Sequence, residues 1–280
     1  AVLSDHYRGL HHFFRQNFSQ VTNPPIDSLR EARVMTLKTR LGNLGNILDQ
    51  DESQCRLLQL ESPVLFTAEF QAMRAYMASS AVEIDCTFDP TAGDNAMRDA
   101  IARIRRESED AVRGGCVHVI LSDEKTGAGR APVPMILATG AVHTHLLRQQ
   151  LRTFTSLNVR SGDCLDVHHF AVLIGVGATT VNAYLAEASI ADRLRRGLFG
   201  DLTLDDCLKR FKKAIGEGLL KVMSKMGIAV ISSYRGGANF EAVGLSRTLV
   251  AEYFPPMQSR ISGIGMAGLQ RKVLEQHGRA

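Results

Sequence analysis

Residues 114–123 read Gly114-Gly115-Cys116-Val117-His118-Val119-Ile120-Leu121-Ser122-Asp123, and this stretch indicates the fold class. The two glycines end a helix that we predict from a cap at Asp94 to Arg113, where apolar residues recur at helical spacing. The apolar run that follows is too continuous for a strand with one face in water. A strand buried on both faces and entered from a helix is typical of a parallel sheet covered by helices.

The same alternation of helix and strand continues along the chain. We predict further strands at residues 82–88, 155–161, 168–174 and 228–233. We predict helices at residues 180–191, at residues 203–227 and from about residue 240. This rhythm fits an open doubly wound sheet and equally a barrel or partial barrel.

Composition excludes several classes of protein. The 280 residues are 45% apolar and 22% charged, which is ordinary for a globular chain. A net charge of +4, from 33 basic and 29 acidic residues, is too balanced to indicate nucleic acid or a membrane surface as a partner. No apolar run approaches the roughly 18–20 residues that span a bilayer. Because the chain lacks a signal peptide and starts at Ala1, we expect a processed product or a piece of a longer polypeptide.

The five cysteines, Cys55, Cys86, Cys116, Cys164 and Cys207, are scattered through the chain. An odd number without a framework suits a reducing compartment, and we predict a cytoplasmic protein. Zinc and iron–sulfur sites need clustered thiolates, and none cluster in this sequence. We therefore interpret the cysteines as small buried apolar residues.

Residues 19–46 have the composition of a connecting arm. Pro24 and Pro25 fix φ, and the residue before them is pushed out of the helical region. Residues 26–33 can form a short helix capped by Asp27 or Ser28, and two Gly-Asn turns follow. This concentration of prolines, a helix cap and turns near the start indicates a segment that crosses from another domain upstream.

Two glycine-bearing loops are candidate ligand sites. In the loop after residues 228–233, Gly236 and Gly237 would let backbone amides approach an anion, and Arg235 could pair with phosphate. A tight turn whose arginine meets a neighbouring carboxylate explains the same residues. The second loop, residues 175–182, lacks the spacing of a dinucleotide fingerprint, and close helix–strand packing explains its glycines equally well.

The remaining histidines and charged residues do not indicate a metal site or a catalytic site. The spacing in His11-His12, His143-x-His145 and His168-His169 does not suit a helical zinc pair, which needs three or four residues. We interpret the arginines at 103, 105 and 106, which are interleaved with acids, as a solvated helix face. No nucleophile with a base and an orienting group can be identified, so we predict no catalytic residue in this chain.

The sequence as a whole resembles a known family, the central domain of the large (α) subunit of bacterial glutamate synthase. The resemblance covers nearly the whole chain and is carried by long collinear motifs at Gln20–Glu31, Leu57–Leu65, Gly140–Arg148, Gly175–Leu185, Lys225–Gly237 and Ser259–Gly265. It implies an α/β fold of parallel strands alternating with helices, barrel-like and related to a degenerate TIM barrel. We expect a lead-in and extended N-terminal arm at residues 1–60, belonging to the same single domain as residues 61–280.

The resemblance also implies a function. Glutamate synthase makes two L-glutamates from L-glutamine and 2-oxoglutarate, with electrons from NADPH or ferredoxin. Its central domain links an N-terminal glutaminase domain to an FMN-binding domain, and ammonia passes between them through a tunnel. We expect no cofactor in this chain, whereas FMN, iron–sulfur clusters and NADPH/FAD belong to the parent complex, which includes a small NADPH-oxidising β subunit. The resemblance is to the bacterial family, which favours NADPH as the electron donor.

From the rigid geometry of the arm we predict that a group of its residues lies near the wall of the tunnel: Thr22, Asn23, Pro24, Pro25, Arg30, Glu31 and Met35. Two alternatives stay open. The chain could be a stand-alone flavin- or phosphate-binding α/β barrel enzyme that uses residues 175–182 and 235–237. It could also be an interaction module that binds a partner through its aromatic lead-in and arm.

Overall fold

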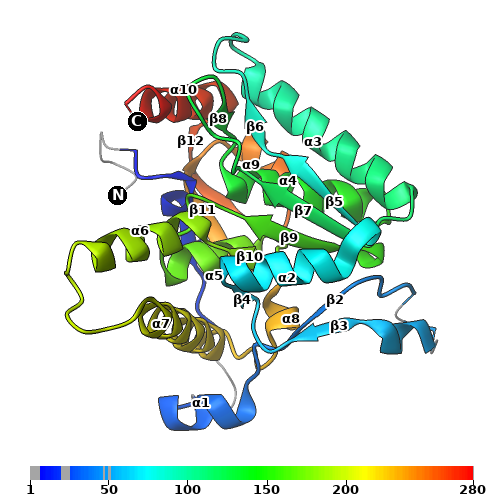
Figure 1. Cartoon of the computed structure of the whole chain (residues 1–280). Coiled ribbons are helices and arrows are strands. Elements are labelled where there is room, and N and C mark those ends of the chain that lie inside the picture. The colour runs from blue at the N-terminus through cyan, green and yellow to red at the C-terminus, as the bar shows by residue number, and fades with distance from the viewer. Residues whose placement is uncertain (1–6, 20–25, 47, 50–51, 280) are drawn as a thin grey trace.

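Five parallel strands form the central sheet of the computed structural model, in the order β4-β10-β9-β7-β5 (Figure 1). The structure describes residues 7–19, 26–46, 48–49 and 52–279. The strands of this sheet are β4 (Val64–Leu65), β5 (Ala81–Asp85), β7 (His118–Ser122), β9 (Ser156–Arg160) and β10 (Thr180–Asn182). The helices are α1 (Ser28–Val34), α2 (Thr67–Met77), α3 (Ala96–Arg113), α4 (Met135–Arg148), α5 (Val167–Gly175), α6 (Tyr184–Arg195), α7 (Leu204–Lys225), α8 (Ile231–Tyr234), α9 (Arg247–Tyr253) and α10 (Met266–His277).

The sheet confirms the predicted α/β class. Strands β5, β7, β9 and β10 follow one another in the chain through helices α3, α4 and α5 and are neighbours in the sheet, which is the strand order of a β/α barrel. Strand β4, which precedes them, lies at the opposite edge beside β10. Over the described residues the sheet keeps these two edges and does not close. The architecture is therefore barrel-like without being a closed barrel.

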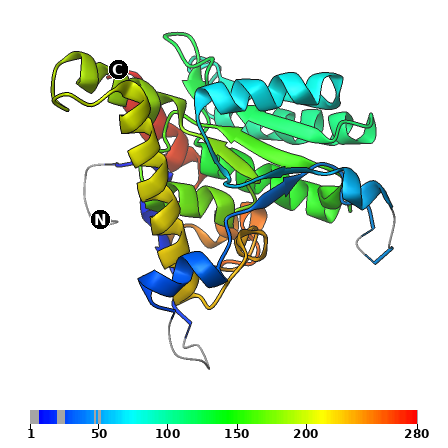
Figure 2. The ribbon, with the colours of Figure 1, turned by 60° about the horizontal axis from the view of Figure 1, so that its bottom comes forward.

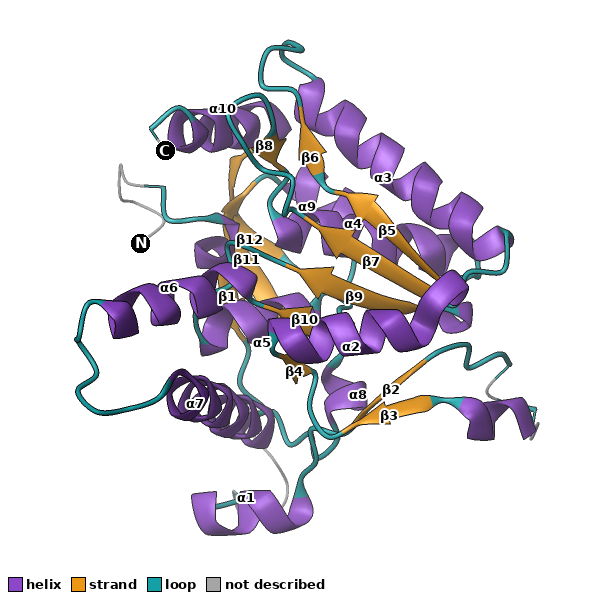
Figure 3. Ribbon diagram, viewed as in Figure 1, coloured by secondary structure: helices purple, strands orange, loops and turns teal. Residues whose placement is uncertain are grey.

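Both faces of the central strands are covered, as the continuous apolar run predicts. On one face Val119 and Leu121 of β7 belong to the main core cluster, with α3, α4 and α5. On the other face Ile120 packs in a second cluster with Phe70 and Met73 of α2. Figure 3 shows α2 lying across the sheet on that side. Alternate residues of one strand thus enter two different apolar layers.

Smaller sheets surround the central one. Near the N-terminus, β1 (Phe14–Gln16) pairs antiparallel with β11 (Phe240–Leu245), which pairs parallel with β12 (Ser259–Ile264). A ribbon of β2 (Thr39–Leu41) and β3 (Leu58–Leu60) projects from the body, and β6 (Thr87–Phe88) pairs with β8 (Ala131–Pro132). Short 3-10 turns lie at Leu10–Phe13, Glu52–Arg56, Ala78–Ser80 and Arg152–Phe154. Within the described part of the chain, no helix is long and apolar enough to cross a membrane.

Four predictions of secondary structure are wrong. Residues 168–174 form most of helix α5, and residues 228–233 end in the short helix α8. Residues 180–182 form strand β10, so the helix begins later, at Tyr184. The helix expected from Phe240 is strand β11.

Local signals placed other ends correctly. The hydroxyl of Thr203 accepts from the backbone N–H of Asp206 and begins α7, and Gly227, with a φ of 68°, lies just past its end. The cap expected at Asp94 is not formed, because α3 begins after Asn95 without a side-chain cap.

Candidate functional site

The predicted cap of the arm helix is present. Both backbone N–H groups of Leu29 and Arg30 donate to Oδ1 of Asp27 at 3.0 Å. The side chain of Arg30 reaches back to Oδ2 of Asp27 at 2.7 Å, and both side chains are exposed. The cap therefore fixes where α1 begins, and it leaves Arg30 at the surface.

Glu31 and Met35 attach the arm to the domain. Ser224 of α7 donates from Oγ to Oε1 of Glu31 at 3.1 Å, and Met35 is 7% exposed within the main core cluster. Beyond Met35, the N–H of Thr36 donates to the carbonyl of Ala229 at 2.8 Å. Figure 2 shows α1 across the end of α7. These two predicted wall residues are thus packed inside this chain.

Thr22, Asn23, Pro24 and Pro25 lie outside the described residues.

Large apolar side chains nevertheless remain exposed on both sides of that gap. Phe18 is 71% exposed, Leu29 is 85% exposed and Val34 is 53% exposed. The ring of Phe18 is covered in part by Nζ of Lys225, 5.4 Å from its centroid. These three exposed apolar side chains make the arm a candidate interaction surface.

The loop of Arg235 does not lie at the carboxyl ends of the parallel strands, where the sequence predicts it. The side chain of Arg235 donates from Nη2 to Oγ1 of Thr39, and Thr39 in turn contacts the carbonyl of Thr179, which precedes β10. The loop therefore meets the amino ends of the parallel strands, because residues 228–233 do not form the strand that would have carried it to the carboxyl ends. Gly236 adopts a φ of 67°, and a Cβ there would lie 2.8 Å from the ring of His143. That glycine is required for close packing.

Arg152 is held beside this loop by backbone and side-chain acceptors. It donates from Nε to Nδ1 of His143 at 3.0 Å, from Nη1 to the carbonyl of Thr155 at 2.6 Å, and from Nη2 to the carbonyl of Gly177 at 2.9 Å. Burial and then the charge of Arg235 lower the pKa of Arg152 to about 9. Burial, followed by the charge of Arg152, lowers the pKa of His143 to about 3, so this imidazole is neutral at pH 7.

The second candidate loop is also explained by packing. Gly175 is the last residue of α5, and a Cβ there would lie 2.5 Å from the ring of Phe240, which packs against it. Gly177 has a φ of 124°, and a Cβ there would lie 2.4 Å from His143. These glycines let rings approach the backbone, so their positions follow from the interior of the chain.

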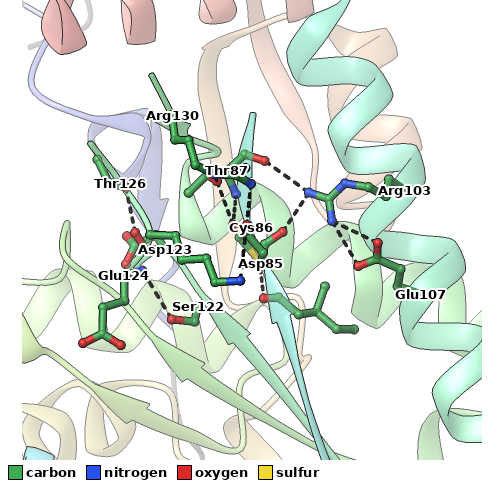
Figure 4. A network of polar contacts seen from close by, with 12 residues as sticks. Asp85, Cys86, Thr87, Arg103, Glu107, Ser122, Asp123, Glu124, Thr126 and Arg130 are labelled. Carbon is green, nitrogen blue, oxygen red and sulfur yellow. Dashed lines mark hydrogen bonds and ion pairs between the residues drawn. The ribbon is translucent and has the colours of Figure 1, made fainter. Parts of the chain in front are cut away.

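At the carboxyl ends of the strands, where α/β proteins usually bind ligands, polar groups bind one another. Figure 4 shows the network around Asp85, at the end of β5. Arg130 donates to Asp85 and to Oγ1 of Thr87, and Arg103 donates to the backbone carbonyls of Asp85 and Thr87 at 2.8 and 3.1 Å. Sequence reasoning placed Arg103 on a solvated face. The two carbonyl acceptors lie 18 and 16 residues upstream of Arg103 and reach it only because α3 packs on β5, so no local sign of this contact is visible in the sequence.

Asp123, just past β7, is a buried carboxyl that the sequence analysis did not single out. Both of its oxygens accept from the N–H of Gly162 at 3.0 Å, and the hydroxyl of Tyr184 hydrogen-bonds to it. Burial, and next the charge of Asp163, raise the pKa of Asp123 to about 7. Burial also raises the pKa of Asp163, which accepts from Oγ of Ser161.

The histidine pairs at 11–12 and 168–169 come together although they are far apart in sequence. The rings of His11 and His169 have centroids 3.3 Å apart, and Nε2 of His168 lies 2.9 Å from the carbonyl of His11. Burial, then the neighbouring histidines, lower the pKa of His11 to about 3. Among the residues that the structure describes, no group of three or more His, Cys, Asp and Glu side chains is placed to hold a metal ion.

Comparison with known proteins agrees with the resemblance found in the sequence. A family profile described as "Glutamate synthase central domain" matches residues 1–246. The chain is 73% identical over 280 residues to the glutamate synthase [NADPH] large chain of Azospirillum brasilense, and 38% identical over 279 residues to that of Bacillus subtilis. It is 36% identical over 293 residues to the ferredoxin-dependent glutamate synthase 2 of a Synechocystis species.

These alignments cover 100%, 99% and 100% of the chain but only 18%, 18% and 19% of the relatives. The chain thus spans less than a fifth of the length of the curated relatives it matches. It belongs to the glutamate synthase central domain family and corresponds to the central domain of the large subunit.

Proposed function

We propose that this chain joins a glutaminase domain to an FMN-binding synthase domain and helps to enclose the path of ammonia between them. The parent enzyme would convert L-glutamine, 2-oxoglutarate and NADPH to two L-glutamates. The end-to-end similarity to large chains more than five times as long supports a role inside a larger polypeptide. In this proposal residues 1–60 are the lead-in and arm, and residues 61–280 are the α/β part of the same domain.

The observation that carries the proposal is the exposed apolar surface of the arm. Phe18, Leu29 and Val34 are more than half exposed, although Glu31 and Met35 of the same segment are buried. Burying an exposed leucine side chain contributes about 1.5–3 kcal/mol. A segment that is anchored on one side and apolar on the other is suited to hold a neighbouring domain in place.

The polar groups elsewhere support a scaffold more than a catalyst. At the carboxyl ends of the strands, Asp85 is bound by Arg130, Glu124 by Arg160, and Glu187 by the side chain of Asn182. These contacts tie the carboxylates to neighbouring side chains of the same domain, although Nε of Arg160 and Oδ1 of Asn182 are buried without a hydrogen-bond partner in the described part of the chain. The tunnel residues proposed from sequence then divide into Arg30, which is exposed, and Glu31 and Met35, which position the arm.

The cofactors of the parent enzyme are proposed to lie elsewhere in the complex. The residues described here do not fit an iron–sulfur cluster, because the free cysteines are dispersed: Cys86, Cys164 and Cys207 are buried, and Cys55 is exposed. FMN would belong to the next domain, and NADPH and FAD to a small β subunit. Free thiols also suit a cytoplasmic enzyme.

Chemical labelling of the full-length large chain tests the role of the arm. Leu29→Cys and Leu198→Cys are compared by alkylation rate at each position, measured by peptide mass. Leu29 is the more exposed of the two in this chain, 85% against 59%, so position 29 would react faster if nothing covered it. The proposal predicts that position 29 reacts at least tenfold more slowly than position 198. Faster alkylation at position 29 would show that no other domain covers the arm.

A further inference from the structure

Five arginines of the described residues are buried or half-buried, and they fall into two groups. Three have a carboxylate partner: Arg103 pairs with Glu107 at 3.0 Å, Arg105 with Glu252 at 3.3 Å, and Arg160 with Glu124 at 2.7 Å. The other two, Arg152 and Arg235, form no ion pair with any carboxylate in the described part of the chain. They also lie close enough that the charge of Arg235 affects the titration of Arg152.

The hydrogen bonds of Arg152 place its charge without neutralising it. All three of its nitrogens donate to neutral acceptors, which are the carbonyls of Thr155 and Gly177 and Nδ1 of His143. Because Nδ1 of His143 accepts, the single proton of the neutral ring is on Nε2. His143 contacts Arg152 and packs against Gly236, next to Arg235, without adding a negative charge, and a protonated ring there would add a third positive charge.

Arg235 has an unused donor in the same place. Its Nη2 donates to Thr39, while its Nε is buried and has no hydrogen-bond partner. Leaving a buried charged donor without an acceptor is costly, and such groups are normally paired. Two uncompensated guanidinium groups next to each other add mutual repulsion.

We propose that Arg152 and Arg235 form a binding site for a carboxylate that comes from outside the described residues. A carboxylate fits because its two oxygens accept from guanidinium nitrogens in one plane, and because a single negative charge offsets the repulsion between the arginines. The carboxylate would bind at Nε of Arg235, beside Thr39 at the start of the β2–β3 ribbon. Its source is either an acidic side chain elsewhere in the parent polypeptide or a free organic acid. The inference is independent of the proposed function.

Parts of the two arginine side chains reach the surface, but Nε of Arg235 is itself buried, so a carboxylate that binds there must displace neighbouring side chains. Arg152 and Arg235 are each half-buried, and Thr39, their neighbour, opens the ribbon that projects from the body (Figure 3). Gly177 and Gly236 hold the ring of His143 against the backbone, which fixes the geometry between the two arginines. The positions of the two arginines are therefore set by the packing of this chain.

The experiment uses the full-length large chain and malonate as the probe. Its structure is determined in a chloride buffer free of carboxylate, sulfate and phosphate, and thermal unfolding is followed against malonate at constant ionic strength. The variants are Arg235→Gln and, as a matched control, Arg106→Gln, an exposed arginine on α3. An acidic side chain within hydrogen-bond distance of Arg235 identifies an internal carboxylate, and malonate then has no effect.

A free-acid site gives a different result. Malonate would then raise the unfolding midpoint saturably, Arg235→Gln would weaken malonate binding at least tenfold, and Arg106→Gln would leave it unchanged. The proposal is overturned if no carboxylate lies near Arg235 in the full-length structure and malonate has no effect. It is also overturned if none lies there and malonate stabilises the Arg235→Gln variant as strongly as the parent.

Discussion

Asp123→Asn tests whether burial keeps the carboxyl group of Asp123 protonated in the native state. The pKa of Asp123 is raised from 3.8 to about 7, so the native state keeps its proton between about pH 4 and pH 7, where the unfolded state has lost it. Stability contributed by this group is therefore present at low pH and is lost as pH rises through that window. Asparagine keeps the shape of the side chain and does not titrate.

The magnitude follows from the shift. Each unit of pKa difference corresponds to about 1.4 kcal/mol, so the raised pKa of Asp123 destabilises the native state relative to the unfolded state by about 2 kcal/mol at pH 5.5 and about 4 kcal/mol at pH 8. The free energy of unfolding of Asp123→Asn, relative to the parent, should rise by about 2 kcal/mol between these two pH values. Changed interactions with Gly162 and Tyr184 would shift the free energy of unfolding of the variant by a similar amount at every pH, so they add little to its dependence on pH.

The assay is urea unfolding of the 280-residue chain followed by far-UV circular dichroism, because the chain contains no tryptophan. Asp89→Asn is the control. Hydrogen bonds from Thr91 lower the pKa of Asp89, so this exposed group is ionised throughout the window in both states. If the difference between Asp123→Asn and the parent stays constant from pH 5.5 to 8, the buried proton is not there and the reasoning is refuted.

Three further predictions use the same unfolding assay. The pKa of His143 is lowered to about 3, so the unfolded state takes up a proton before the native state does as pH falls below 6.5. His143→Gln should therefore lose roughly 2 kcal/mol less stability than the parent between pH 6.5 and pH 5. Equal losses in the two proteins would contradict a neutral buried ring. Thr203→Ala removes the capping box of α7 and should cost about 1 kcal/mol, whereas no loss would show that the cap contributes nothing. Met35→Ala should cost about 2–5 kcal/mol because the side chain is in the core, and a loss below 1 kcal/mol would contradict that packing.

The predictable parts of the fold are those with strong local signals. Residues 118–122 and 156–160 form strands as predicted, and the start of α7 at Leu204 was found from Thr203. Helix α5 was mistaken for a strand because its nine residues are nearly all buried against α7, α4 and β10. A helix that is apolar on every side has no periodicity to distinguish it from a buried strand.

Long-range pairing explains the other errors. Strand β11 was predicted as a helix, and its partner β1 lies more than two hundred residues earlier, with Phe14 opposite Ala242. The same limit applies to the candidate sites. Arg235 was identified from its own loop, but Arg152 and His143 reach it only through the packing of glycines at 177 and 236. Nothing in the spacing of these residues reveals the pair.

The central claim is that the arm helps to hold two other domains in register so that ammonia does not escape. The most direct measurement is the yield of glutamate and free ammonia per glutamine consumed by the full-length enzyme, with the proposed small subunit, comparing Leu29→Glu with Leu198→Glu. If the claim is right, Leu198→Glu keeps two glutamates per glutamine, and Leu29→Glu falls toward one glutamate with one ammonia released. Two glutamates per glutamine from both variants, without free ammonia, would contradict it.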